Sequence, residues 1–160
     1  MERFHHLLSM PEYIAAQEKI DKLEQERIYC GHSRNHCFDV ARIAYILALE
    51  EKLPFSKELI YTTAFLHDIG RVNEYQGQCS HESGSVVMAL QLLPKCEYTN
   101  DEILQISDAI AVHRRNGAQS KRTLADVLYR ADKLSRDCGH CKARETCKWT
   151  EEEKNSLIQY

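Results

Sequence analysis

The sequence predicts an all-α fold. Only six glycines and three prolines occur in 160 residues, and so few breakers favour long helices over many short strands. Apolar residues recur at three- and four-residue spacing in several segments, whereas no stretch alternates apolar and polar residues convincingly. The length suits one domain with one hydrophobic core. We therefore expect a compact bundle of about six helices, followed by a short cysteine-rich segment.

Six helices are expected in chain order. Their approximate spans are residues 11–28, 35–52, 57–69, 81–93, 101–113 and 120–134. Pro11 suits a first helical turn, Ser56 could cap the third helix, and Gly70 is placed as its C-terminal stop. The second, fourth and fifth helices should end at Leu53-Pro54, Pro94 and Asn116-Gly117. A further short helix could start near Glu151.

The expected buried faces differ in strength. In the second helix, apolar residues recur at helical spacing at Val40, Ile43, Ala44 and Leu47. The first helix carries only a broken apolar stripe among many charges, at Ile14, Ile20, Leu23 and Ile28. We expect these positions to face the core.

Charge and hydropathy exclude several classes of protein. The formal net charge is −3, with both signs mixed along the chain, so nothing demands a nucleic acid or a membrane as partner. No window approaches the roughly 18 consecutive apolar residues that a membrane span needs. The N-terminal residues lack a basic region followed by an apolar stretch, so no signal peptide is expected and the expected compartment is the cytoplasm.

Two ionisable residues interrupt an apolar run. His67 and Asp68 lie within Ala-Phe-Leu-His-Asp-Ile-Gly, which should be buried. A buried carboxylate is costly unless it is paired or bound to a metal. The two side chains could satisfy each other or the backbone, or they could be metal ligands.

Three more polar residues lie on apolar helical faces. Asp132 follows Leu128 by four residues, so both lie on one face, although Asp132 could instead pair with Arg136 at the surface. His36 shares the face of Val40, and His113 ends an apolar helix. A single such histidine is more often a hydrogen-bonded core residue than a ligand. Together, however, imidazoles and carboxylates from several helices could converge on one ion of Fe, Mn, Zn, Ni or Co.

The order of these residues resembles the HD superfamily of metal-dependent phosphohydrolases. Residues 31–41, with His36 rather than His32 as the ligand, look like the first motif of that family. Residues 64–71 look like the HD motif itself, and Tyr-Arg-Ala-Asp-Lys-Leu at 129–134 looks like the closing motif. The resemblance runs from about residue 30 to 135. It implies a helical domain in residues 1–135 whose metal ligands are His36, His67, Asp68 and Asp132.

The resemblance also suggests a second ion. His81 and His113 fall between the HD motif and the closing motif, as in dinuclear members such as the bacterial symmetrical diadenosine tetraphosphate hydrolases. This likeness implies that Asp68 bridges to an ion held by His81 and His113. Alternatively, these two histidines could contact the substrate or orient other ligands.

The expected reaction is phosphoester or phosphoanhydride hydrolysis by a metal-activated hydroxide. The substrate would be a small anionic molecule, a nucleotide or dinucleotide. Arg71 follows the HD pair and Lys133 follows the closing aspartate; both could bind phosphate, or both could be solvated charges at helix ends. Two alternative hypotheses for the function are a non-catalytic metal, redox or nucleotide sensor and an HD oxygenase. A homodimer is left open.

A cysteine-rich tail covers residues 136–160, and we expect it to pack on the same domain. Of seven cysteines, Cys138, Cys141 and Cys147 are clustered at spacings that suit a metal loop. The spacing also matches the last three cysteines of the iron–sulfur loop in endonuclease III-like glycosylases. A fourth ligand would have to be His140 or a distant cysteine such as Cys30. Structural zinc, an iron–sulfur cluster and free or redox-active thiols all remain open.

Overall fold

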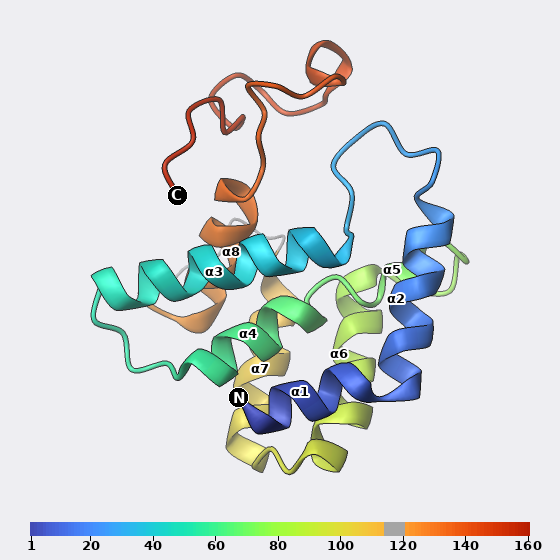
Figure 1. Ribbon diagram of the computed structural model, residues 1–160, viewed down its shortest axis with the longest axis vertical. Helices are drawn as coiled ribbons and strands as arrows, with labels where there is room; N and C mark the ends of the chain where they lie inside the picture. The colour runs from blue at the N-terminus through green and yellow to red at the C-terminus, as the bar shows by residue number, and fades with distance from the viewer. Residues whose placement is uncertain (114–120) are drawn as a thin grey trace.

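The computed structural model describes residues 1–113 and 121–160, and these residues form helices and no strand. Figure 1 shows them as a bundle. The α-helices are α1 (Glu2–Ser9), α2 (Pro11–Leu23), α3 (Arg34–Glu50), α4 (Lys57–Leu66), α5 (Arg71–Glu74), α6 (His81–Leu92), α7 (Asn100–Val112) and α8 (Leu124–Leu134). Two 3₁₀ turns span Leu93–Cys96 and Arg144–Thr146. The expectation of an all-α bundle is confirmed.

The structure corrects several expected elements. The described residues hold eight α-helices rather than about six, because α1 and the short α5 were not foreseen. Helix α2 ends at Leu23 instead of continuing to about residue 28. No helix starts near Glu151, where the chain only turns. The expected stop at Asn116-Gly117 and the expected helix start near Ser120 lie outside the described residues.

Side-chain caps explain where several helices begin. The hydroxyl groups of Ser56, Ser80 and Thr123 accept hydrogen bonds from backbone amides in the first turns of α4, α6 and α8. Thr99 forms a reciprocal capping box with Glu102 at the start of α7. Each cap satisfies amide groups that have no partner within the helix. The expected cap at Ser56 is therefore confirmed.

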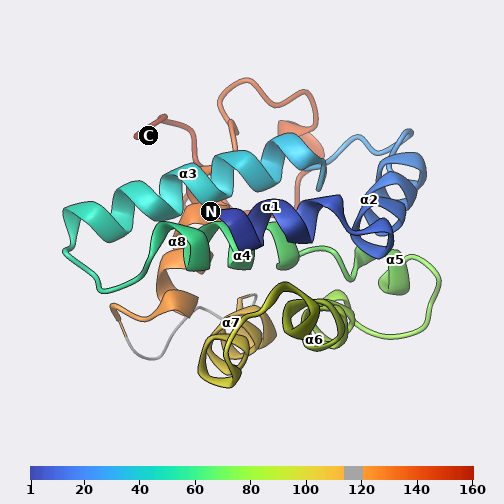
Figure 2. The ribbon, with the colours of Figure 1, turned by 60° about the horizontal axis from the view of Figure 1, so that its bottom comes forward.

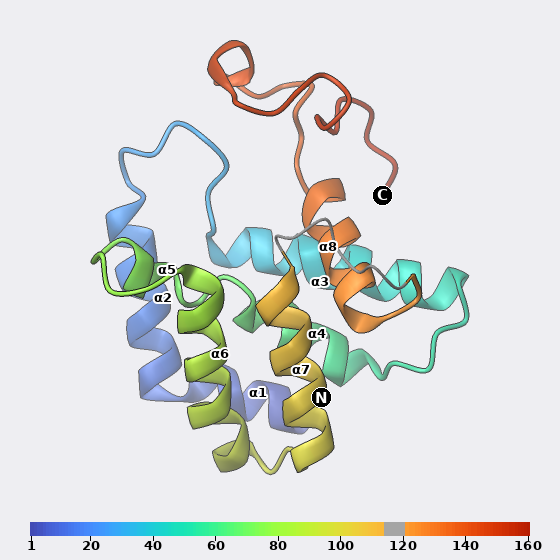
Figure 3. The same cartoon turned by 180° about the vertical axis from the view of Figure 1, so that it is seen from behind.

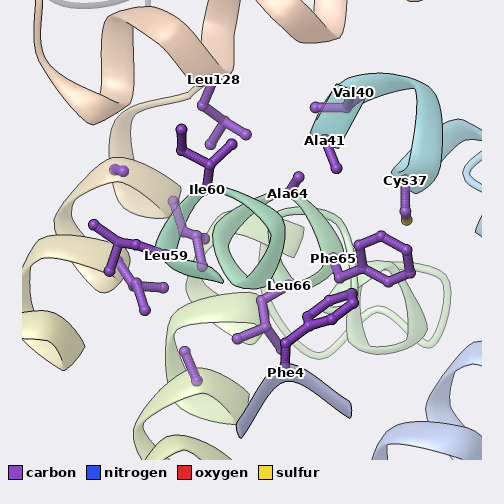
Figure 4. Packing of buried hydrophobic residues seen from close by; sticks show 14 of the residues in the cluster. Phe4, Cys37, Val40, Ala41, Leu59, Ile60, Ala64, Phe65, Leu66 and Leu128 are labelled. Atoms are coloured by element: carbon purple, nitrogen blue, oxygen red, sulfur yellow. The ribbon is translucent and has the colours of Figure 1, made fainter. Parts of the chain in front are cut away.

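Helix α4 lies at the centre of the core. Its residues from Leu59 to Leu66 are buried on every side except at Tyr61, as expected for a helix enclosed by others. Figure 4 shows Ile60 facing Leu128 of α8, Ala64 facing Ala41 of α3, and Phe65 against Phe4 of α1. Two polar residues of α4 find internal partners: Thr62 pairs with the hydroxyl of Tyr98 at 2.6 Å, and Thr63 donates to the carbonyl of Leu59.

The other helices surround α4. Helix α3 packs on α4 and α8, while α6 and α7 pack on each other and on α4 from the opposite side. Figure 2 shows α4 and α1 between α3 and the α6–α7 pair. The expected face of α3 is buried at Val40, Ile43, Ala44 and Leu47. The stripe expected in α2 was wrong, because only Ile20 of that set is buried and Tyr13 and Ala16 fill the core instead.

A tight turn after α4 brings α6 close. The amide of Gly70 donates to Ser85 Oγ at 2.8 Å, and that hydroxyl donates to the carbonyl of His67 at 2.9 Å. Gly70 was expected to stop the preceding helix, but α4 ends earlier, at Leu66, and Gly70, with φ −71°, does not take the left-handed conformation typical of a glycine at a helix end. Its need for glycine is steric, since an added Cβ would lie 2.2 Å from the carbonyl oxygen of His81 and from the amide of Ser85. This close approach places the first turn of α6 beside Asp68.

The last segment runs over one end of the bundle. Figure 3 shows residues 135–160 above the end of α8, on the same side as the loop between α2 and α3. The side-chain amide of Asn155 donates to the carbonyls of Leu134 and Arg136, both at 2.8 Å. These bonds fold the C-terminal residues back onto the end of α8. Among the described residues, none of the helices has the length and apolar character needed to cross a membrane.

Candidate metal centre

Six residues expected to bind metal meet at one place, and each lies at or near a helix end. His36 lies in the first turn of α3, and His81 opens α6. His67 and Asp68 follow α4, and His113 follows α7. Asp132 lies in the last turn of α8. The five helices thus bring together residues separated by almost 100 positions, and the four histidines and Asp68 are buried.

The first group is formed by His36, His67, Asp68 and Asp132. His36 Nε2 lies 3.2 Å from Asp132 Oδ1, and His67 Nε2 lies 3.0 Å from Asp68 Oδ2. One ligand atom from each residue lies within 4.8 Å of the others. Two imidazoles and two carboxylates at this spacing can hold one divalent transition metal ion.

The second group is formed by Asp68, His81 and His113. His81 Nε2 lies 3.3 Å from Asp68 Oδ1, and His113 Nε2 lies 3.9 Å from the same oxygen. Asp68 therefore directs Oδ2 toward the first group and Oδ1 toward the second. This is the arrangement in which one carboxylate can bridge two ions.

Hydrogen bonds donated by Nδ1 fix the imidazoles so that Nε2 faces the site. His67 Nδ1 donates to the carbonyl of Ala64, and His113 Nδ1 donates to that of Ile110, both at 2.6 Å. A carbonyl oxygen can only accept, so Nδ1 carries the proton and Nε2 of a neutral ring keeps its lone pair. Ser135 Oγ uses its own proton on the carbonyl of Asp132 and lies 3.2 Å from His36 Nδ1. Such partners are typical of histidines that bind metal.

In the part of the chain that the structure describes, three imidazole Nε2 atoms of this centre lack a favourable partner that a bound cation would supply. Within the described residues, His67 Nε2 has no hydrogen-bond partner, although Asp68 Oδ2 is only 3.0 Å away. His81 Nε2 and His113 Nε2 lie 3.3 Å apart, and two lone pairs repel at that distance. A buried polar atom without a partner is costly, and a metal ion bound by these atoms would remove the cost. The donor set therefore fits divalent metal ions.

Both carboxylates stay ionised, although Asp68 is buried and Asp132 is half-buried. Burial opposes ionisation of Asp68, but the charge of His67, whose Nε2 lies 3.0 Å from Asp68 Oδ2, outweighs this effect and holds the pKa of Asp68 well below its usual range. Burial likewise opposes ionisation of Asp132, but a hydrogen bond with His36 and the charge of Arg136 lower its pKa. Two anions, one buried and one half-buried, make this centre attractive to cations.

The histidines respond to the same field in different ways. Burial lowers the pKa of His36 and of His113 to about 4 in each case, and it also lowers the pKa of His81. Burial opposes protonation of His67 as well, but the charge of Asp68 prevails and its pKa is raised. At neutral pH, His36, His81 and His113 are therefore neutral rings with lone pairs available for a metal.

Two arginines contact the carboxylates. Arg136 Nη2 lies 2.9 Å from Asp132 Oδ1 and 3.0 Å from His36 Nε2. The pairing of Asp132 with Arg136, which we considered as a surface contact, thus occurs inside the site. Arg71 donates to Asp68 Oδ1 at 3.1 Å and to Glu74 at 2.7 Å. Arg71 is therefore tied to the centre and is not a solvated charge at a helix end.

A fifth histidine was not foreseen at this centre. His32 is buried, with Nε2 3.8 Å from Asp68 Oδ2. Its Nδ1 contacts Glu24, which also accepts a hydrogen bond from the hydroxyl of Tyr75. Burial opposes ionisation of Glu24, but its bonds with His32 and Tyr75 lower its pKa to about 2. From the sequence we expected His36 rather than His32 as a ligand. The only signal in the sequence that the two could lie near one another was their separation of four residues.

A pocket of about 450 Å³ opens onto the centre. Asp68, Asp132, His32 and His113 are among the residues that line it. Its walls carry five basic side chains, from Arg27, Arg71, Lys133, Arg136 and Lys148. Tyr29 and Trp149 add aromatic surface, and Lys133 Nζ lies 3.8 Å from the centre of a Trp149 ring. The lining of the pocket therefore combines anionic ligand groups with several cationic side chains.

Comparisons with known proteins identify the family and the fold. The HD domain family model matches residues 34–137. An uncharacterized protein of Clostridium beijerinckii is 42% identical over 160 residues, covering the whole of both chains. The crystal structure of a predicted HD superfamily hydrolase from an uncultured Thermotogales bacterium is 22% identical, with a TM-score of 0.62 over 96% of this chain and 87% of that one. That structural likeness establishes a shared fold, and the family match across more than half of the sequence shows that this chain belongs to the HD domain family.

Proposed function

We propose that this protein is a metal-dependent phosphohydrolase whose two divalent ions share Asp68 and whose substrate is a nucleotide or dinucleotide. The observation that carries the proposal is the position of the two Asp68 oxygens, one toward His36 and His67 and the other toward His81 and His113. The dinuclear reading extends the resemblance to symmetrical diadenosine tetraphosphate hydrolases. A module that only senses a ligand would have no need of this complete set.

The metal ions would supply a water molecule with a lowered pKa and positive charge for the phosphoryl oxygens. Imidazole and carboxylate ligands suit Fe, Mn, Zn, Ni or Co. The protein contributes the orientation of the ligands, because hydrogen bonds donated by the Nδ1 atoms of His67 and His113 to backbone carbonyls direct Nε2 inward. Asp68 and Asp132 contribute the negative charge that holds the ions in place.

The basic side chains that line the pocket favour an anionic substrate. Arg136 supplies positive charge to His36 Nε2 and Asp132 Oδ1. If His36 Nε2 and Asp132 Oδ1 bind a metal ion, the guanidinium hydrogens of Arg136 become available for phosphate oxygens. Lys133, which follows Asp132 in the sequence, also lines this pocket. Cations placed around a transferring phosphoryl group stabilise the charge that develops on its oxygens.

The aromatic surface supports a nucleoside as the other half of the substrate. Tyr29 and Trp149 both line the pocket, and bases stack on such rings. A volume of about 450 Å³ is within the usual range for small-molecule sites. The combination of basic and aromatic side chains in one pocket favours a nucleotide over a simple phosphoester.

A substrate panel with Trp149→Ala tests this proposal. Metal-stripped protein should be inactive, and Mn²⁺ or Fe²⁺ should restore phosphate release from nucleotides or dinucleoside polyphosphates. Trp149→Ala should raise KM for those substrates about tenfold or more, the loss of one stacking contact, with a smaller effect on p-nitrophenyl phosphate. Absence of phosphate release from every substrate by fully metal-loaded protein would contradict the proposed activity, and equal effects of Trp149→Ala on all substrates would contradict the nucleotide assignment.

A further inference from the structure

Four of the seven cysteines gather from two distant segments. Cys30 lies in the loop between α2 and α3, and the other three, Cys138, Cys141 and Cys147, lie in the tail after α8. Burial raises the pKa of the Cys138 thiol, and the thiolates of Cys30, Cys141 and Cys147 raise it further. Cys138 is thus within electrostatic reach of three thiols, one of them more than 100 residues away in sequence.

Specific contacts hold the two segments together. The hydroxyl of Tyr29 donates to the carbonyl of Thr146 at 3.3 Å, so the neighbours of Cys30 and Cys147 are joined. Arg136 Nη1 donates to the carbonyl of Gly31 at 2.9 Å. Cys30 and Cys147 also line the same pocket. The approach of Cys30 to the tail is therefore fixed on both sides of the cysteine.

The three tail cysteines are arranged by the backbone around Arg144. The amide of Arg144 donates to the carbonyl of Cys141 at 3.1 Å, and the amide of Cys147 donates to that of Arg144 at 3.4 Å. The guanidinium of Arg144 donates to the carbonyl of Cys138 at 2.9 Å. The backbone amide of Cys138 donates to the carbonyl of Asn155 at 3.0 Å. These bonds fold the backbone that carries the three tail cysteines.

The structure distinguishes between the two candidates for a fourth ligand. The side chain of His140 is 86% exposed and its Nδ1 pairs with Asp137 at 3.0 Å, so its Nδ1 already has a partner outside the cysteine group. The remaining cysteines lie elsewhere, with Cys37 and Cys96 in the core and Cys79 exposed. Cys30 is the thiol that the fold brings to the tail.

The segment that carries these cysteines has little other means of holding its shape. From residue 135 to 160 the regular structure is limited to one 3₁₀ turn of three residues, Arg144–Thr146. Cys138 and Ala143 are its buried apolar residues, and both lie outside the main core cluster. A short irregular segment with so small a core is commonly fixed by a metal.

We propose that Cys30, Cys138, Cys141 and Cys147 form a second metal centre, in which four thiolates bind a thiophilic metal. Soft thiolate ligands select zinc or an iron–sulfur cluster, whereas the HD centre offers only nitrogen and oxygen. On binding, each thiol releases its proton, and the positive charge of the metal removes the mutual repulsion of the thiolates. The proposal is independent of the phosphohydrolase activity.

The spacing of the sulfurs bears on the kind of metal. A single tetrahedral zinc ion, with Zn–S bonds of about 2.3 Å, brings its sulfurs to within about 4 Å of one another. Among the described residues, no three cysteine sulfurs lie within 4.8 Å of one another. A single zinc ion would therefore require the thiol groups to move closer together on binding, whereas an iron–sulfur cluster, which is larger and is also held by four cysteines, would require less movement. Metal analysis distinguishes these two occupants of one site.

The centre would also shape the pocket of the HD site. Thr146, Cys147, Lys148 and Trp149 line that pocket directly, and Trp149 packs against Lys133. A metal bound to Cys147 would therefore fix the position of this wall. Loss of the metal should free the wall without removing any ligand of the HD centre.

Metal and sulfide analysis of anaerobically purified protein tests the proposal. Wild-type protein should contain iron with acid-labile sulfide, or one zinc ion, beyond the metal of the HD centre. Cys30→Ser and Cys141→Ser should each lose this fraction, whereas Cys79→Ser, at an exposed cysteine outside the group, should retain it. Asp68→Ala should also retain it, which separates this centre from the HD centre. Retention by Cys30→Ser of the full thiolate-bound metal would overturn the ligand set.

A thiol titration of native wild-type protein removes any dependence on how the variants fold. With the metal bound, Cys30, Cys138, Cys141 and Cys147 should be protected from alkylation, and a chelator should expose all four to the reagent, as mass spectrometry of the labelled peptides would show. Rapid labelling of these four cysteines in untreated anaerobic protein would overturn the proposal.

Discussion

Asp68→Ala is expected to lower kcat for phosphate release by about 10³-fold or more and to remove metal from both halves of the HD centre. The variant takes away the one carboxylate whose two oxygens reach both ligand groups. It also leaves Arg71 without its 3.1 Å partner. The water activation and charge stabilisation that metal ions supply are worth several kcal/mol in the transition state. Steady-state kinetics and metal analysis of the same preparation measure both effects.

Asp39→Ala is the matched control. Asp39 lies on α3, one turn beyond His36, but its side chain is 53% exposed. Its Oδ1 lies 3.8 Å from Nη1 of Arg42. It should keep wild-type kinetics and metal content. If Asp68→Ala turned over within about tenfold of wild type, the assignment of Asp68 as the shared ligand would be wrong.

Gly70→Ala is expected to destabilise the fold by about 3 kcal/mol or more. The added Cβ would lie 2.2 Å from the carbonyl oxygen of His81 and 2.2 Å from the amide nitrogen of Ser85. Both are backbone atoms of α6, so no side-chain rotation relieves the clash and the helix itself must shift. That shift would also move His81 away from Asp68. Urea denaturation followed by circular dichroism measures the change in the free energy of unfolding.

Gly31→Ala is the control for this effect. A Cβ at Gly31 would meet its nearest neighbour, a carboxylate oxygen of Glu24, at an ordinary 3.4 Å. We expect a change in the free energy of unfolding of less than about 1 kcal/mol, as for most surface substitutions. Equal stability of Gly70→Ala and wild type would show that the turn and α6 are not packed as closely as described.

The helices with strong apolar spacing could be predicted closely. The expected spans 35–52 and 101–113 compare with α3 at Arg34–Glu50 and α7 at Asn100–Val112. In α3, the helical spacing of Val40 and Leu47 is unambiguous, and Thr99 with Glu102 fixes the start of α7 through a capping box. Local sequence determines these elements because each carries both its buried face and its boundary signals.

Elements that depend on tertiary packing could not be predicted. Helix α1 is eight residues long, too short to be stable alone, and it is held by Phe4 against Phe65 at a ring distance of 5.0 Å. Helix α5 has only four residues and none of them is buried. In α2, Ile14 is exposed while Tyr13 is fully buried, so the tertiary environment, and not the hydrophobicity of each residue, decides which face turns inward.

The same distinction applies to the sites. His36, His67 and Asp132 could be found because each interrupts an apolar helical face, and the chain brings them together as the motif order implied. His32 precedes the cap residue of α3, so no helical periodicity marks it. The approach of Cys30 to the tail depends on contacts such as Tyr29 with Thr146, which are 117 residues apart. Long-range contacts of this kind leave no local pattern in the sequence.

Anomalous diffraction from crystals of the manganese-loaded protein tests the central claim most directly. The account predicts two manganese peaks on either side of Asp68, about 3.5–4 Å apart as in other two-metal sites. One should be bound by His36, His67 and Asp132, and the other by His81 and His113. In His81→Ala, the second peak should weaken or disappear while the first remains. A single peak in fully loaded wild-type protein, or peaks that do not contact Asp68, would contradict the account.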